Sequence, residues 1–76
     1  MINANQIKPG TPVVGSNGPQ FAIVDHVEGT NNIKLRKDDR GDHHYIPMSW
    51  VTNVDDKVHV DRPTDRAMRE WTTKPE

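Results

Sequence analysis

Residues 16–28, SNGPQFAIVDHVE, decide the fold, because they join a hairpin turn to the longest strand that the sequence predicts. The Asn-Gly pair at positions 17 and 18 lies between two apolar runs, which is the strongest short-range indication of a β-hairpin. The strand that follows spans residues 20–28, and its apolar side chains break the two-residue alternation between Ile23 and Val24. A β-bulge or a sharp bend at that point would return both sets of apolar side chains to the interior.

The segments on either side of this hairpin continue the strand pattern. Residues 11–15 supply its first arm, and Pro12 should lie at a strand start or a sheet edge because proline lacks an N–H. Residues 33–36, IKLR, alternate inward and outward side chains. Residues 37–42, KDDRGD, are polar throughout and predict an exposed loop.

The second half of the chain predicts further short strands. After the loop the chain returns over residues 43–51, where Pro47 indicates a turn or a bend. Residues 53–60 predict a final hairpin with a two-residue turn, in which Val58 and Val60 face inward. The total is five or six short strands separated by closely spaced turns, a pattern typical of an all-β sandwich or barrel.

Helical signals flank this β-rich region. A single helical turn is expected at the N-terminus, with Asn3 as its cap and Ile2 and Ile7 in staple positions. A helix over about residues 64–72 should begin with Thr64 as its cap. Its pairs at i,i+4 spacing are Asp65–Arg69 and Arg66–Glu70, and its apolar stripe is Ala67, Met68 and Trp71. So short a helix is not stable alone, and its stripe must therefore pack against the rest of the domain.

These elements predict a small all-β domain, a five- to six-stranded barrel with a short N-terminal turn and a C-terminal helix. The 76 residues suffice for one domain, with the barrel at about residues 10–61 and the helix at about residues 64–72. Closure is favoured over an open sheet because it hides strand edges that so small a sheet cannot otherwise cover. A domain this small buries only about 60% of its unfolded surface, so its stability margin is thin.

Composition narrows the class of protein further. The chain has no cysteine, which excludes disulfides and thiolate metal sites and favours a cytoplasmic location. It has no apolar run of about 20 residues, as a membrane-spanning helix needs, and no signal-peptide pattern. Lys and Arg total 10 against 11 Asp and Glu, so the net charge of -1 gives no general indication of nucleic-acid binding.

Several segments together suggest a family. They are residues 7–13 (IKPGTPV), 15–18 (GSNG), 24–29 (VDHVEG), 43–51 (HHYIPMSWV), 54–55 (VD) and 67–71 (AMREW). In these segments the chain resembles a bacterial family of small proteins, domain-of-unknown-function family 2171, and residues 43–51 are the most specific stretch. That family is similar to PRC-barrel domains, the small barrels of photosynthetic reaction-centre H subunits and of the C-terminal half of a ribosome-maturation factor.

The resemblance implies a PRC-barrel-like fold and a binding or scaffolding role, and it implies no catalytic residues. The chain departs from the family pattern at residues 21–23, FAI, where smaller residues are usual, and at Pro19 after the turn. Neither change alters the expected fold. Both argue against assuming the same partner.

The four histidines are the candidates for metal binding. His43 and His44 are adjacent on an expected strand, so their side chains point to opposite faces and cannot bind one metal ion together. A site would need His26 or His59 with a carboxylate such as Asp25 or Asp42, and nothing in the spacing supplies the three or four ligands of a zinc site. We therefore expect no metal and no cofactor. The residues that remain of interest form a candidate polar cluster: Asp25, His26, His43 and His44.

No catalytic pattern is present. The neighbours Asp25 and His26 could exchange a proton with a substrate only if a nucleophile or a pocket lay beside them. Ser16 and Ser49 lie in turns without the glycines of a nucleophile elbow, and no phosphate-binding glycine pattern occurs. We therefore expect that the protein is not an enzyme.

Two surfaces are candidates for interaction. Arg36, Lys37 and Arg40, with Tyr45 nearby, could form a basic and aromatic face of the kind that contacts RNA or the ribosome, although acidic residues in the same loop weaken it. Met68 and Trp71 on the terminal helix suit a protein partner or a second copy of the chain. We expect a non-catalytic binding or scaffold module that mediates protein–protein contact or self-assembly, including a homodimer. The alternatives are an RNA- or ribosome-associated accessory module and a histidine-based metal-binding protein.

Overall fold

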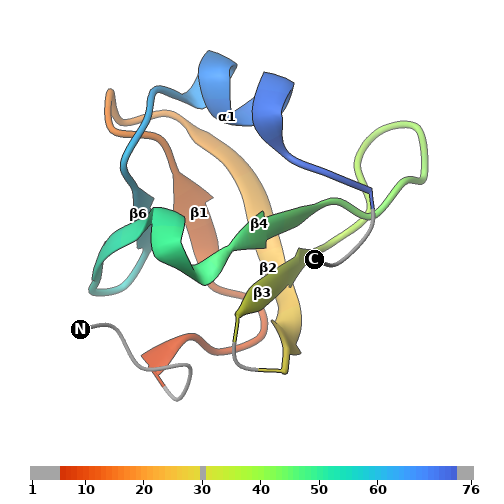
Figure 1. Ribbon diagram of the computed structural model, residues 1–76, viewed down its shortest axis with the longest axis horizontal. Coiled ribbons are helices and arrows are strands. Elements are labelled where there is room, and N and C mark those ends of the chain that lie inside the picture. Colours follow the sequence, from red (N-terminus) through yellow and green to blue (C-terminus); the bar gives the residue numbers. More distant parts are fainter. Residues whose placement is uncertain (1–5, 30, 74–76) are drawn as a thin grey trace.

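The computed structural model describes residues 6–29 and 31–73, and within them six strands form one sheet with a short helix across one end (Figure 1). The elements are β1 (Pro12–Val14), β2 (Gln20–Glu28), β3 (Asn32–Leu35), β4 (Tyr45–Pro47), the 3-10 helix η2 (Met48–Trp50), β5 (Val51–Val54), β6 (Val58–Val60) and α1 (Thr64–Glu70). The predicted fold class, mainly β with a C-terminal helix, is confirmed. The expected N-terminal cap Asn3 and staple residue Ile2 lie outside the described residues.

The strand order is β4-β3-β2-β1-β6-β5, with antiparallel neighbours except for the parallel pair β1 and β6. β4 and β5 are the two edges of the described sheet, so the closure that we expected does not occur. The chain passes from β4 through the single turn of η2 directly into β5, yet the two strands lie at opposite ends of the strand order and do not pair. One edge is instead covered by Thr72, whose N–H and C=O exchange hydrogen bonds of 3.1 and 2.6 Å with Tyr45 of β4.

β2 has the bounds that the sequence predicts, and Figure 1 shows it as the long curved strand that pairs with both halves of the sheet. The expected bulge is present, but the pairing with β3 shifts register between Val24 and His26, which makes Asp25 the extra residue. Val24 is therefore fully buried, whereas Ile23 is only half-buried and lies outside the core. The prediction that both sets of apolar side chains return to the interior was wrong for Ile23, because the bulge follows Val24 instead of preceding it.

The core is formed by inward-facing side chains of β1, β2, β3, β4 and β6. Seven side chains are fully buried there: Ile33, Leu35, Ile46, Val13, Val24, Val58 and Val60. The predicted alternation in β3 and the inward-facing valines of β6 are thus confirmed. Burying a side chain of this size contributes about 1.5–3 kcal/mol, so these seven account for much of the driving force for folding.

Some local predictions differ from the structure. β4 begins at Tyr45, so His43 and His44 precede the strand, although the backbone N–H of Leu35 still donates to the carbonyl of His44 at 2.8 Å. The turn between β5 and β6 has three residues instead of two, because the carboxylate of Asp55 accepts a hydrogen bond of 2.8 Å from the N–H of Lys57.

The N-terminus of α1 is held by the turn between β1 and β2. Thr64, which we expected as the cap, is the first residue of the helix, and Pro63 is the N-cap residue. The hydroxyl of Thr64 donates to the carbonyl of Pro19 at 2.7 Å instead of capping the helix. The side chain of Asn17 accepts a bond of 3.1 Å from the N–H of Thr64, so the helix is capped from the hairpin. Gly15 makes this approach feasible, since a Cβ there would lie 2.8 Å from the Cα of Thr64 and closer still to its nitrogen and hydroxyl.

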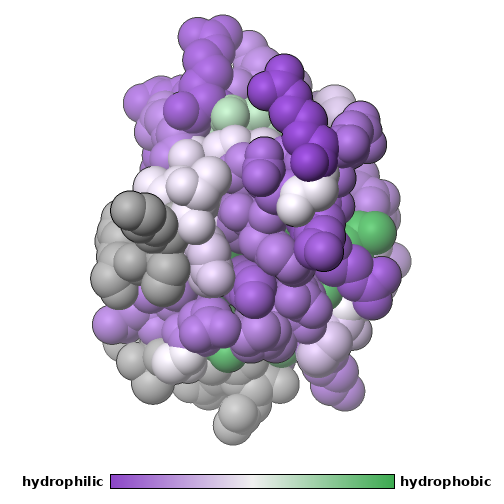
Figure 2. All heavy atoms as spheres, turned by 90° about the vertical axis from the view of Figure 1, so that its right-hand side faces the viewer, coloured by the Kyte–Doolittle hydropathy of each residue, from purple (hydrophilic) through white to green (hydrophobic). Residues whose placement is uncertain are grey.

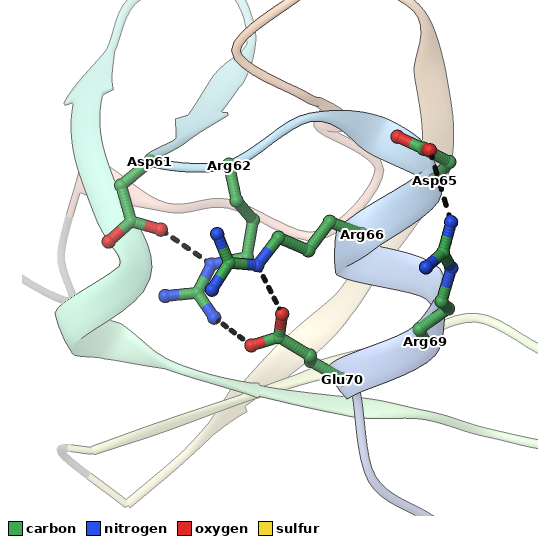
Figure 3. A network of polar contacts seen from close by, with 6 residues as sticks. All are labelled: Asp61, Arg62, Asp65, Arg66, Arg69 and Glu70. Carbon is green, nitrogen blue, oxygen red and sulfur yellow. Dashed lines mark hydrogen bonds and ion pairs between the residues drawn. The ribbon is translucent and has the colours of Figure 1, made fainter.

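The other side of α1 is joined to the sheet by a polar network (Figure 3). Arg62, which follows β6, donates to Asp61 at 2.7 Å and to Glu70 of α1 at 2.6 Å. Its guanidinium also lies 3.8 Å from the ring centroid of the buried Trp50. Arg66 donates to the same Glu70, and both of the i,i+4 ion pairs that the sequence predicts are present on α1.

We expect Gly15→Ala to lower the free energy of unfolding by about 1–3 kcal/mol, because the added methyl group must push α1 away from the hairpin turn. Chemical denaturation of the two proteins would measure this. Ser16→Ala, at the exposed neighbouring position, should change stability by less than about 0.5 kcal/mol. Equal effects of the two substitutions would contradict the close packing of Gly15 on Thr64.

Arg62→Lys should destabilise the protein by about 1 kcal/mol, since a lysine cannot stack on Trp50 and bond two carboxylates at once. Arg66→Lys is the matched control: the Arg66 side chain is 66% exposed against 18% for Arg62, and its exposed pair should contribute no more than about 0.5 kcal/mol. The same denaturation experiment compares them. A larger loss for Arg66→Lys would show that the network does not depend on Arg62.

Candidate functional site

A groove of about 670 Å³ opens on the outside of the domain. Three elements form it: β2 contributes residues 20–23, the loop after β3 contributes residues 36–40, and the C-terminal end of α1 contributes Met68 and Trp71. The loop projects from one side of the molecule in Figure 1, and Figure 2 shows that side as mostly hydrophilic with small apolar areas between the polar residues. The groove therefore combines polar walls with apolar surface.

The apolar surface comes from β2 and from the end of α1. Met68 is 46% exposed, the one exposed large hydrophobic side chain of the described chain. Trp71 follows the helix as its C-cap residue, and its N–H donates to the carbonyl of Ala67 at 2.9 Å. Phe21 is partly buried, with its ring centroid 5.9 Å from that of Trp71. The predicted apolar stripe is thus divided, because Ala67 is buried in the core while Met68 and Trp71 face the groove.

The ring of His44 packs against one face of Trp71. The two rings are stacked, with centroids 3.8 Å apart and an angle of 5° between their planes. The Nδ1 atom of His44 is buried and lies 3.5 Å from Oδ2 of Asp38, in a geometry too poor for a hydrogen bond. One face of Trp71 is therefore already covered, and the ring is fixed in place beside the loop.

The loop that forms the other wall is shaped by Asp38. Its Oδ1 accepts hydrogen bonds from the backbone N–H groups of Arg40 at 2.8 Å and of Asp42 at 3.0 Å. The bond from Asp42, together with that from Arg40 and the nearby His44, lowers the pKa of Asp38 below its ordinary value of 3.8. Gly41 adopts a φ of 84°, in the left-handed region that favours glycine, and so closes the turn. The carboxylate of Asp38 therefore orders the loop by accepting hydrogen bonds from the loop's own backbone N–H groups.

The three cations of this loop differ from the arginines near α1 in having no ion-pair partner among the described residues. Arg62, Arg66 and Arg69 each form an ion pair with a carboxylate. Arg36, Lys37 and Arg40 line the groove, and within the described residues none of the three side chains lies within 4.0 Å of a carboxylate oxygen as an ion pair. The charge of Arg40 contributes to the lowered pKa of Asp38, and none of the three cations is held at ion-pair distance by a carboxylate in the described part of the chain, so a ligand can reach them.

The structure brings together five of the six residues that the sequence singles out for interaction: Arg36, Lys37, Arg40, Met68 and Trp71. The sequence treats them as two separate surfaces, whereas they face one groove. Tyr45 lies apart on β4, where its backbone pairs with Lys34 and Thr72. Sequence reasoning missed the contribution of residues 20–23, although the broken alternation of this strand was a signal that some of its apolar side chains stay outside.

The candidate polar cluster is only partly assembled. Asp25 lies 3.6 Å from Nδ1 of His26 and 4.0 Å from Nδ1 of His43, and His26 also contacts Glu28, which the sequence analysis did not include. His44 is not part of it, because it faces Asp38 and Trp71. In the described part of the chain no group of three or more His, Asp or Glu side chains is arranged to hold a metal ion. The cluster is separate from the groove.

Comparison with known proteins gives one match. The model of a family described as an uncharacterized protein conserved in bacteria (DUF2171) matches residues 7–68. No curated protein and no solved structure matches the chain significantly. Among the described residues, no helix is long and apolar enough to cross a membrane. The expected relation to PRC-barrel domains stays a prediction.

The loop should respond to acid in a defined direction. Because the pKa of Asp38 in the folded state lies below 3.8, its ordering effect is fully present above that pH and is lost as the pH falls through the lowered value. An NMR titration should show the amide signals of Arg40 and Asp42 moving together with the Asp38 carboxyl signal. In Asp38→Asn, which keeps an oxygen acceptor, the two amides should lose this titration. A carboxyl that titrates at or above 3.8 would contradict the arrangement.

Proposed function

The chain belongs to the DUF2171 family of uncharacterised bacterial proteins, and from that premise we propose that it is a non-catalytic module that binds a protein partner through the groove between β2, the loop after β3 and α1. The observation that carries the proposal is that the exposed Met68 and the partly buried Phe21 and Trp71 meet, in one groove, cations without an ion-pair partner in the part of the chain that the structure describes. A cytoplasmic location, which the absence of cysteine favours, and a PRC-barrel-like ancestry of the fold are parts of the same proposal.

The apolar side of the groove supports a protein partner. An exposed methionine beside an aromatic ring is a common feature of protein-binding surfaces, because the flexible thioether adapts to the side chain that it meets. Tryptophan and arginine are among the residues most enriched in binding hot spots, and Trp71 and Arg36 both line this groove. A partner that fills the groove would cover both at once.

RNA fits the same groove less well. Recognition of single-stranded RNA depends on free aromatic faces on which bases stack. One face of Trp71 is occupied by the ring of His44, and Phe21 is only partly exposed.

The histidines of the candidate polar cluster lie outside the groove. His26 and His43 are gathered around Asp25, and none of these three residues lines the groove. The side chains that do line it are aromatic, aliphatic, amide, cationic or carboxylate groups without a neighbouring nucleophile. Their chemistry supports recognition of a partner rather than turnover of a substrate.

Met68→Glu tests the proposal, since it places a charge on the apolar side of the groove without disturbing the core. A photo-reactive residue at position 68, introduced in bacterial cells, should cross-link to a protein partner, whereas the same residue at the exposed position 53 on β5 should not. Calorimetry with the purified partner should then show at least about tenfold weaker binding to Met68→Glu, a loss of about 1.4 kcal/mol.

Asn53→Glu is the control that adds the same charge away from the groove, and it should leave the affinity unchanged. Cross-linking of position 68 to the chain itself would identify the partner as a second copy. Equal affinities of the two variants for the captured partner would show that the groove is not its binding site. Cross-linking to nucleic acid alone would favour the RNA alternative.

A further inference from the structure

The position of the groove on β2 says which part of the strand a ligand meets. Side chains of successive residues in a strand point to opposite faces, so a hollow on one face touches only every second residue. Four consecutive residues of β2, at positions 20–23, line this groove. The pairing with β1 shifts register at Phe21, so strict alternation does not hold there, but Arg36, which donates its N–H to the carbonyl of Ile23 on the other edge of β2, also lines the groove. The groove therefore includes this edge of the strand, where backbone N–H and C=O groups lie.

β3 pairs with only part of this edge of β2. On its other side, this half of β2 pairs with β1. β3 pairs with β2 only from Val24 to Glu28, and its last contact is the N–H of Arg36, which donates to the carbonyl of Ile23 at 2.8 Å. In the described part of the chain, no strand continues this pairing along residues 20–22.

We propose that the groove binds an extended, acidic peptide segment of the partner protein, which lies along the open edge of β2. The segment places an apolar side chain against Phe21 and Met68 and its carboxylates against the cations of the loop. This inference rests on the proposed function and adds to it the chemistry of the partner.

The charges of the groove select an acidic segment. Three cations and two carboxylates line it, which leaves one net positive charge in the groove, whereas the chain as a whole carries -1. Asp38 is bound to its own loop through two backbone N–H groups, so its carboxylate is partly neutralised there. A segment rich in Asp or Glu would supply the counter-charges that Arg36, Lys37 and Arg40 lack.

The shape of the groove selects an extended segment. The open edge, residues 20–22, is about 10 Å long at about 3.3 Å per residue, so it accommodates about three residues of a partner strand. Alternate side chains of such a strand would point toward the apolar side of the groove and away from it. An apolar residue flanked by acidic residues satisfies both requirements, and addition of a strand to a sheet edge is a common mode of peptide recognition.

The test uses synthetic peptides of about eight residues with blocked ends, a length that exceeds the edge by about two residues on each side. The probe has a central Leu-x-Phe flanked by Glu, and the two matched peptides carry Ser or Lys in place of Glu. Titrated into the whole ¹⁵N-labelled chain, the Glu peptide should shift the amide signals of residues 20–23 and 36–40. Its affinity should exceed that of the Lys peptide at least about tenfold at about 50 mM salt, and the difference should shrink at about 300 mM.

Charge variants of the protein separate the groove from general electrostatics. Arg36→Gln with Arg40→Gln should weaken binding of the Glu peptide at least about fivefold. Arg66→Gln with Arg69→Gln removes the same charge from the outer side of α1, where both arginines already have carboxylate partners, and should have little effect. A Glu peptide with a central proline should also bind weakly, because proline cannot complete the pairing with a strand edge.

The outcomes distinguish this inference from the proposed function. If the Lys peptide binds as well as the Glu peptide, if no Glu peptide binds at millimolar concentration, or if only a single-stranded oligouridylate shifts the groove signals, the acidic-segment inference is overturned. The proposed function would still stand if the partner captured through position 68 remained sensitive to Met68→Glu. Shifts confined to other faces of the domain would overturn the inference as well.

Discussion

The close approach of Gly15 to Thr64 determines where α1 lies, and the groove depends on it. Any larger residue at position 15 would collide with the first turn of the helix. The absence of that side chain lets Asn17 and the carbonyl of Pro19 reach Thr64 and replace the cap that the helix does not supply for itself. With its first turn fixed, the seven-residue helix presents Met68 and Trp71 beside β2. The position of the apolar side of the groove therefore follows from a contact between the hairpin turn and the start of the helix.

Arginines have two different roles in this small domain. Arg62 connects α1 to the sheet because it can stack on Trp50 while it bonds two carboxylates, a combination that the planar guanidinium allows. Arg36 and Arg40 lie on a loop whose own carboxylate, Asp38, is already engaged with backbone N–H groups. Because the loop is ordered through its backbone, the cations need not hold it together. They are left to contact a ligand.

Local patterns predicted the parts of this fold that depend on neighbouring residues. The hairpin at positions 17 and 18, the bounds of β2 and the inward-facing Val58 and Val60 are all properties of short segments, and all are confirmed. The position of the bulge at Asp25 could not be read in the same way, since it depends on which register packs best against β3. The open sheet likewise depends on η2 and on the distant Thr72, which covers the edge of β4.

The candidate site likewise combines features that neighbouring residues determine with features that depend on distant contacts. The cationic loop and the apolar helix face were visible in the sequence as residue types, because charge and helical spacing are local properties. Their meeting was not, since residues 20–23 and 36–40 are brought together by the pairing of β2 with β3, and Trp71 joins them only through the packing of α1. Tyr45 was grouped with the loop cations because it is near them in sequence, yet the pairing of β4 places it elsewhere. His44 was assigned to a polar cluster, and its stacking on Trp71 makes it a support for the groove.

A binding site at the junction of three elements also suits a domain with a thin stability margin. The loop is joined to β2 by the hydrogen bond from the N–H of Arg36 to the carbonyl of Ile23. The helix α1 is joined to the hairpin of β1 and β2 by the bond from Thr64 to Pro19 and by the contact of the partly buried Phe21 and Trp71. A ligand that binds only the folded chain raises its stability by mass action, and the gain is about 2.7 kcal/mol at a hundredfold excess over Kd. A strand added along the edge of β2 would bury Phe21 and Met68 and contact all three elements at once. The same contacts that give recognition would thus strengthen the junction of the three elements.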